Sequence, residues 1–95
     1  MNVIWLDSAQ KQLEEIIIYI SGDSSKAIAE KYVADLFERA NKILEFPEVG
    51  MIYSNMGRKI IRRLIVDKTK SVFYRIEKDN ILILTIRDNR TDWKK

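Results

Sequence analysis

The sequence contains neither cysteine nor histidine. Without cysteine the chain has no disulfide framework and no thiol nucleophile, and without both residues it has no zinc site of the usual Cys/His kind. A histidine general base is excluded as well. Carboxylate-only metal sites remain open, but no loop has the acidic spacing that calcium requires. We therefore expect no metal and no cofactor, and any catalysis has to use Arg, Lys, Tyr, Ser, Thr, Asp or Glu.

Long apolar runs are also missing, and none approaches the roughly 20 residues that a membrane span needs. The amino terminus has no basic lead, and its apolar run ends at Asp7, which is not the pattern of a signal peptide. We therefore expect no contact with membranes and a cytoplasmic location. With 46% hydrophobic and 33% charged residues, the composition is that of one globular domain over residues 1–95.

Charge is unevenly distributed along the chain, although its net value is only +3. Residues 1–57 carry 5 basic and 9 acidic side chains, whereas residues 58–95 carry 12 basic and 5 acidic ones. This asymmetry is typical of a face that binds a polyanion or an acidic partner. A sheet face that is merely kept soluble by its charges has the same composition, so both interpretations stay open.

The first quarter of the chain has the pattern of a strand followed by a helix. Residues 3–6 are apolar and include strong β formers, which predicts a short strand. Asp7 is placed to cap a helix, with Gln10 three residues later to complete the cap. Apolar residues then recur at helical spacing up to Gly22, a natural helix stop.

A second helix is predicted to follow the polar turn at residues 23–25. Its apolar stripe continues for about five turns, until Pro47 ends it. Because the linker between the two helices is short, they should form an antiparallel hairpin. Four aromatic side chains on these first elements have spacings compatible with the core and are predicted to pack there: Trp5, Tyr19, Tyr32 and Phe37.

In the second half the apolar period changes to two, the period of strands. Alternation predicts strands over residues 60–66 and 71–76, joined through a polar hairpin turn at 77–80 to the nearly continuous apolar run 81–86. Residues 51–56 form a loop or a further short strand. The predicted fold class is α+β: an N-terminal strand, an antiparallel helical hairpin and a three- to four-stranded antiparallel sheet.

Several segments together carry a resemblance to a known family. They are Val3-x-Trp5, Ala9, Leu13 and Ile16 leading to Tyr19-Ile20, Leu44-Glu45-Phe46-Pro47-Glu48-x-Gly50, Arg62-Arg63-Leu64, Val72-Phe73-Tyr74-Arg75-Ile76, and the run from Ile81 to Arg90. In order and spacing, over nearly the whole chain, these segments resemble the toxins of the RelE/ParE superfamily. The resemblance implies the fold class already derived, and it marks Tyr74 as a structural tyrosine of a core strand.

The resemblance also implies a function. Such proteins are toxins of bacterial type II toxin–antitoxin pairs, in plasmid stabilisation among other settings, and a small antitoxin from the same operon neutralises them. That antitoxin usually has a DNA-binding N-terminal part and a C-terminal segment that folds over the toxin, so DNA would be bound only through the antitoxin. ParE-like members inhibit DNA gyrase, whereas RelE-like members cut messenger RNA in the ribosomal A site.

The ribonuclease alternative requires a base, a cation and an acid around the reacting phosphate. Arg90 matches the family arginine that follows the last core strand, and Arg62 and Lys70 are the other candidates for a catalytic set. The arginine expected near Lys70 is replaced by Ser71, and no tyrosine follows the last strand. Trp93 cannot substitute for that tyrosine, because an indole is not a useful acid or base.

The long helical hairpin and the Phe46-Pro47-Glu48 junction favour the ParE-like branch. The predicted contacts with a target or an antitoxin are then binding residues rather than catalytic ones: Arg58, Arg62, Arg63, Arg87, Arg90 and Trp93. A solvated strand edge, or a local Arg–Asp surface pair, is the plainer interpretation of the same arginines. If Arg62 and Arg63 share a strand, they point to opposite faces. A protein of toxin fold that has lost its toxicity is a further alternative.

Overall fold

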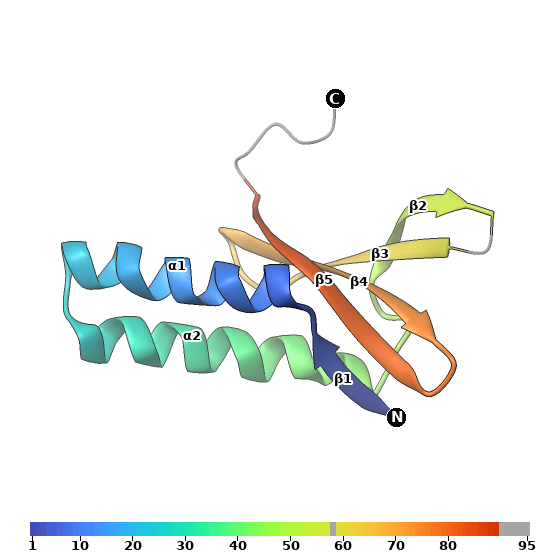
Figure 1. The fold of residues 1–95 in the computed structure, drawn as a ribbon, viewed down its shortest axis with the longest axis horizontal. Coiled ribbons are helices and arrows are strands. Elements are labelled where there is room, and N and C mark those ends of the chain that lie inside the picture. The colour runs from blue at the N-terminus through green and yellow to red at the C-terminus, as the bar shows by residue number, and fades with distance from the viewer. Residues whose placement is uncertain (58, 90–95) are drawn as a thin grey trace.

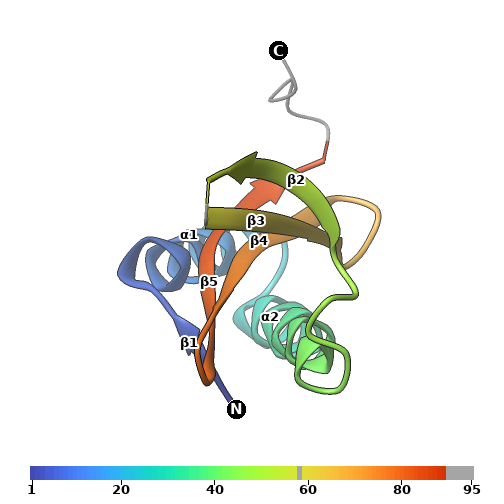
Figure 2. The same ribbon diagram turned by 90° about the vertical axis from the view of Figure 1, so that its right-hand side faces the viewer.

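The computed structural model describes residues 1–57 and 59–89. In chain order it contains β1 (Asn2–Trp5), α1 (Asp7–Asp23), α2 (Lys26–Ala40), the 3-10 helix η1 (Asn41–Leu44), β2 (Met51–Met56), β3 (Lys59–Ile65), β4 (Lys70–Glu77) and β5 (Asn80–Asp88). The helices form a hairpin that extends from one side of a strongly twisted sheet (Figures 1 and 2). This arrangement confirms the predicted α+β class.

The sheet has five strands in the order β1-β5-β4-β3-β2. The four C-terminal strands form an antiparallel meander, and β1 joins its end in parallel with β5. The sequence predicted β1, β3, β4 and β5, and it left residues 51–56, which form β2, as a loop or a short strand. It did not predict that β1 completes the same sheet, because a parallel pairing between the two ends of the chain leaves no local signal.

The ends of the helices differ from the prediction. Leu6, not Asp7, is the N-cap of α1 and makes no side-chain capping bond. Asp7 is the first helical residue, and the Gln10 side chain donates instead to the Trp5 carbonyl at 2.7 Å. Gly22 does not stop the helix, which continues to Asp23.

The second helix begins as predicted but ends earlier. Ser25 caps α2, since its side chain accepts a hydrogen bond from the backbone N–H of Ile28 at 3.2 Å. The α-helix ends at Ala40, and one 3-10 turn, η1, replaces the last part of the predicted five turns. This tighter turn places Ile43 in the core, where it is fully buried.

The start of α1 closes the free edge of β5. Because β1 pairs with β5 only as far as Ile83, the backbone beyond that residue lacks a neighbouring strand. Ser8 Oγ donates to the Leu84 carbonyl at 2.6 Å, and Gln12 Oε1 accepts from the Ile86 N–H at 2.6 Å. Helical side chains thus satisfy backbone groups that an edge strand would otherwise expose.

The core lies between the helical hairpin, η1 and one face of the sheet. Its fully or almost fully buried members are Ala9, Leu36, Ala40, Ile43, Val72, Tyr74, Ile81 and Ile83. Tyr74 confirms its structural interpretation: its hydroxyl donates to the Pro47 carbonyl and accepts from the Gly50 N–H, both at 2.8 Å. A Cβ on Gly50 would lie 2.8 Å from the Tyr74 ring, so glycine is required at this contact.

The other aromatic predictions had mixed outcomes. Trp5 is 9% exposed and stacks on Phe37 with ring centroids 5.2 Å apart, although Phe37 itself remains 43% exposed. Tyr32 is half-buried and bonded through its hydroxyl. The prediction was wrong for Tyr19, which is 73% exposed.

Candidate functional site: the basic strands and the end of β5

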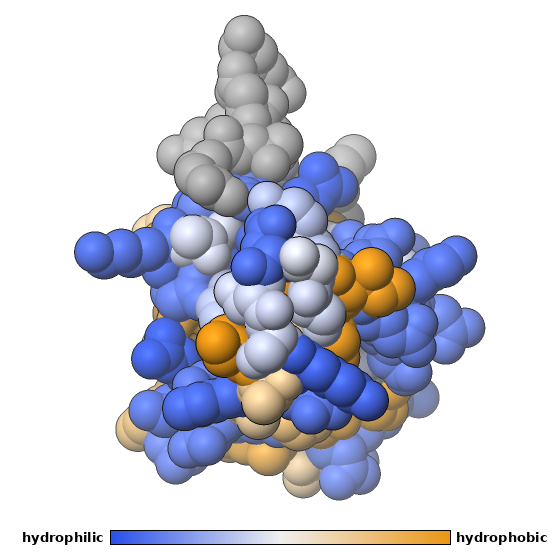
Figure 3. All heavy atoms as spheres, turned by 90° about the vertical axis from the view of Figure 1, so that its left-hand side faces the viewer, coloured by the Kyte–Doolittle hydropathy of each residue, from blue (hydrophilic) through white to orange (hydrophobic). Residues whose placement is uncertain are grey.

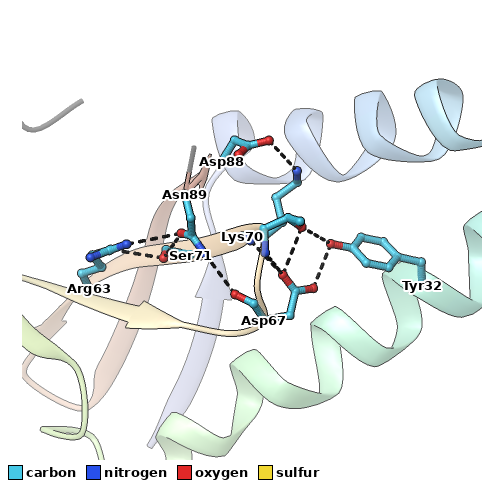
Figure 4. Close-up of polar contacts among 8 residues, drawn as sticks. Tyr32, Arg63, Asp67, Lys70, Ser71, Asp88 and Asn89 are labelled. Atoms are coloured by element: carbon cyan, nitrogen blue, oxygen red, sulfur yellow. Dashed lines mark hydrogen bonds and ion pairs between the residues drawn. The ribbon is translucent and has the colours of Figure 1, made fainter. Parts of the chain in front are cut away.

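A polar network joins the end of β5 to β3 and to the turn between β3 and β4 (Figure 4). Asn89, directly after β5, donates from its backbone N–H to the Thr69 carbonyl at 2.7 Å and from its amide to the Asp67 carbonyl at 3.0 Å. Its amide oxygen accepts from Ser71 Oγ at 2.5 Å and from Arg63 Nη2 at 3.3 Å. These bonds fix the point at which the chain leaves the sheet.

Asp67 organises the turn itself. One of its carboxylate oxygens accepts from the backbone N–H groups of Thr69 and Lys70, each at 2.8 Å, while the other accepts from the Tyr32 hydroxyl at 2.9 Å. Burial acts to raise the pKa of Asp67, but the bonds from Thr69, Tyr32 and Lys70 outweigh it and hold the pKa below its ordinary value. Burial raises the pKa of Tyr32. The turn is therefore anchored to α2 by an ionised carboxylate and a protonated phenol.

A groove of about 570 Å³ runs beside this network, between the helical hairpin and the end of β5. It has apolar walls with charged groups at its margin and is lined by Gln12, Glu15, Ile16, Tyr19, Ile20, Tyr32, Thr69, Lys70, Ile86 and Asp88. Lys70 forms an ion pair with Asp88 at 3.3 Å. The groove thus combines apolar walls with a cation that is already paired to a carboxylate. Such a lining suits a peptide segment better than a phosphate, which would need an excess of positive charge.

Apolar side chains also lie on the outside of the hairpin. Ile18 is 71% exposed and Ile28 is 57% exposed, in addition to Tyr19. Viewed from the hairpin end, hydrophobic surface interrupts a mostly hydrophilic one (Figure 3). Exposed apolar groups of this size on a small domain are typical of a surface that binds another protein.

Arg62 and Arg63 lie next to each other on β3 and point to opposite faces, as predicted. Arg62 Nη1 donates to the carbonyls of Gly50 at 2.9 Å and Glu48 at 3.2 Å, which holds the loop before β2. Arg63 Nε donates to Ser71 Oγ at 3.2 Å on the other face. A single binding face can therefore use only one of these two arginines.

The described members of the predicted catalytic set do not converge. Arg62 is paired with Tyr74 across β3 and β4, and Lys70 lies four residues before Tyr74. Four residues of a strand span about 13 Å, so the backbone positions of Lys70 and Arg62 lie about that far apart along the sheet. Lys70 points to Asp88 and Arg62 to backbone carbonyls, so neither lies beside the other.

The remaining predicted contacts divide into two groups. Arg87 is exposed near the end of β5, across from Ser71 of β4. Arg58, Arg90 and Trp93 lie outside the described residues.

Within residues 1–57 and 59–89, no cluster of three acidic side chains could hold a metal ion, and no helix is long and apolar enough to cross a membrane.

Comparison with known families identifies the class of protein. The family model described as the ParE toxin of the type II toxin–antitoxin system parDE matches residues 3–93. The chain belongs to the ParE toxin family. This assignment agrees with the RelE/ParE resemblance of the sequence and with its preference for the ParE-like branch.

A solved structure supports the fold of this ParE-family toxin. A chain of the chromosomal ParDE toxin–antitoxin system from P. aeruginosa superposes with a TM-score of 0.80, covering 93% of this chain and 95% of that one. The two sequences are 21% identical, so the likeness concerns the fold. No curated protein sequence matches the chain.

Sequence reasoning missed most of the polar network around Asn89. Asp67, Thr69, Ser71 and Tyr32 were not singled out as site residues, although Asp67 before a short polar turn has the pattern of an Asx turn. The partners of Asn89 are 18 to 26 residues away in the chain, and no local pattern indicates such pairs.

Proposed function

We propose that this ParE-family protein is a growth-inhibiting toxin that binds DNA gyrase, catalyses no reaction itself and is neutralised in the cytoplasm by a cognate antitoxin. The observation that carries the proposal is the absence of convergence between Arg62 and Lys70, combined with the family match over residues 3–93. Cleavage of RNA needs its acid, base and cation around one phosphate. Arg62 and Lys70 instead make contacts that hold the fold together.

The basic second half supports binding in place of catalysis. Arg87 is exposed near the end of β5, where it can meet an acidic surface. Arg63 lies at the same end of the sheet, bonded to Ser71 and Asn89, and is proposed as a further contact there. Arg58, Arg90 and Trp93 are proposed as further contacts with gyrase or antitoxin, and Arg62 as a contact through the opposite face. In this proposal DNA is engaged only through the antitoxin, because the chain carries no recognised nucleic-acid-binding motif.

A paired assay on purified toxin, freed of antitoxin, tests the proposal. One arm measures DNA supercoiling by gyrase and accumulation of cleaved DNA; the other measures cleavage of messenger RNA on programmed ribosomes. We expect gyrase inhibition with intact RNA. RNA cleavage that is lost in Arg90→Ala would support the ribosome-dependent nuclease instead.

A non-toxic toxin-fold partner in an antitoxin–DNA complex is the remaining alternative. Expression of the chain alone separates it from both toxic functions, because only a toxin arrests growth. Normal growth with folded protein present, together with no effect in either arm of the paired assay, would support this alternative.

A further inference from the structure

The two edges of the sheet are protected to very different degrees. At one edge β1 has only four residues, and α1 then takes over and satisfies the backbone of β5. At the other edge lies β2 (Met51–Met56), and no other described strand pairs with its outer side. An edge strand presents a row of backbone donors and acceptors that another chain can use for pairing.

The sequence of β2 contains few of the features that block such pairing. Soluble proteins usually place a charge or a proline in an exposed edge, and Met51–Met56 contains neither. Met51, Ile52 and Tyr53 are 64%, 54% and 47% exposed. The register shift between Ile52 and Ser54 is the one protective device, and it limits the length of each pairing run without covering the edge.

The strand behind this edge is strongly cationic. Of the five positions of β2 paired with β3, three face a cation: Met51 is across from Arg63, Ile52 from Arg62 and Met56 from Lys59. A strand added beyond β2 would lie about 10 Å from β3, within the reach of long basic side chains. Carboxylates on the Arg62 face of such a strand would be attracted to Arg62, whose guanidinium lies at the Gly50 and Glu48 carbonyls just before β2, whereas Arg63 is directed toward Ser71 and Asn89.

The edge favours an acidic partner over a second copy of the chain. In a β2–β2 pairing both copies would place their register shift in the shared ladder, where it interrupts pairing. The two β3 strands would lie about 14 Å apart, and their cations would gain no carboxylate partner. An acidic partner supplies carboxylates and need not carry a register shift.

We propose that the open edge of β2 binds an extended segment of the neutralising partner, in which apolar side chains alternate with carboxylates. The segment adds a sixth strand to the sheet: its backbone pairs with β2, its apolar side chains lie on the face of Tyr53, and its carboxylates lie on the opposite face, beside Ile52 and toward Arg62. This inference rests on the proposed function, because it supplies a binding surface for the antitoxin that the function requires.

A synthetic peptide tests the edge without knowledge of the antitoxin. The probe is a short end-blocked peptide in which glutamate and valine alternate, added to the isotopically labelled full chain. We expect slowed amide exchange and shifted backbone signals in residues 51–56. A peptide of the same length and charge with proline in place of valine lacks backbone donors at alternate positions and should have no such effect. Signal changes confined to the hairpin groove, or equal changes with both peptides, would overturn the proposal.

Two isoleucines of identical exposure supply matched variants of the protein. Ile52 on β2 and Ile65 on β3 are each 54% exposed, but Ile65 lies beyond the span of β3 that pairs with β2 and so outside the proposed new ladder. Ile52→Glu should weaken binding of the glutamate–valine peptide about tenfold, because it places like charge opposite like charge in the new ladder. Ile65→Glu adds the same charge and should change binding much less. Equal weakening by both variants would mean that only long-range charge attracts the peptide.

The oligomeric state and the gyrase assay separate the remaining outcomes. Self-association of the free chain that disappears in Ile52→Glu would show that the edge binds a second copy and would contradict the acidic occupant. Peptide pairing does not depend on the target, so a toxin that leaves gyrase untouched but binds the peptide at β2 would refute the proposed function and leave the edge assignment standing. Gyrase inhibition by a toxin that does not pair with the peptide would support the proposed function and refute the edge assignment.

Discussion

At the scale of single residues, Tyr74 shows how one hydroxyl joins core and loop. It is fully buried on β4 and bonds both to the Pro47 carbonyl and to the Gly50 N–H. The loop before β2 therefore depends on a strand that lies two positions away in the sheet. Burial raises the pKa of Tyr74, so the hydroxyl stays protonated and able to donate at neutral pH.

Tyr74→Phe should lower the free energy of unfolding by about 1 to 3 kcal/mol, because it leaves the buried Gly50 N–H without an acceptor. Urea denaturation followed by circular dichroism measures the change. Tyr19→Phe is the matched control, since the same oxygen is removed from a side chain that is 73% exposed. Equal stabilities for the two variants would refute the role assigned to the Tyr74 hydroxyl.

Asp67 gives the chain a defined response to acid. Its pKa in the folded state lies below the ordinary value of 3.8, so the folded state favours the ionised carboxylate. The stabilisation is complete above the unfolded pKa and is lost as the pH falls from there through the lower folded pKa. The sensitive window therefore begins near pH 4 and extends downward.

Asp67→Asn should be less stable than the parent at neutral pH, and the difference should narrow as the pH falls through that window. The free energy of unfolding of both proteins, measured by urea titration at several pH values, tests this expectation. A difference that stays constant down to the most acidic condition would show that the carboxylate charge contributes nothing to the Asp67 turn.

At the scale of elements, the clearest interaction is the closure of β5 by α1. Gln12 takes the place of a neighbouring strand by accepting from the Ile86 N–H and from Thr85 Oγ1. This contact links the helical hairpin to the sheet near the groove. It also explains why β5 needs no neighbouring strand on this side beyond Ile83.

Gln12→Ala should destabilise the protein by about 1 kcal/mol and speed amide exchange at Ile86 more than at the sheet centre. Lys11→Ala is a suitable control, because Lys11 is exposed on the same helix turn. Hydrogen exchange followed by NMR provides the measurement. Unchanged exchange at Ile86 would mean that water replaces the side chain without cost.

Local periodicity explains which elements could be predicted from the sequence. Residues 60–66 and 71–76 alternate between apolar and other side chains, and residues 81–86 are almost continuously apolar. Both patterns follow from strands that pack against the core, so they can be recognised in the sequence. The end of α2 was missed because the switch to η1 is set by the burial of Ile43, a tertiary contact. The parallel pairing of β1 and the partners of Asn89 were missed for the same reason: they join distant parts of the chain.

At the scale of the whole molecule, the acidic first half and basic second half separate into helices and sheet. The cations of β3 and β5 belong to the meander, whereas most acidic side chains of residues 1–57 lie on the helical hairpin. Such a distribution steers an acidic partner toward the sheet and raises its rate of association, an effect that salt screens.

Arg87→Gln should slow association with gyrase and reduce the dependence of that rate on salt, while leaving the unfolding free energy nearly unchanged. Lys31→Gln removes one charge from α2, in a side chain that is 78% exposed, and should have a smaller effect. Stopped-flow binding at several salt concentrations compares the two. Equal effects would show that net charge matters and the position of Arg87 does not.

The proposed action of this ParE-family toxin on gyrase, by binding and not by catalysis, is directly testable. The most direct measurement is a titration of toxin into a fixed amount of gyrase and plasmid DNA, with cleaved DNA as the readout and messenger RNA on programmed ribosomes as a parallel substrate. We expect cleaved DNA to rise until toxin and gyrase are present in comparable amounts and then to stay level, with the RNA intact. Multiple RNA cleavages per toxin molecule, with gyrase unaffected, would contradict this expectation.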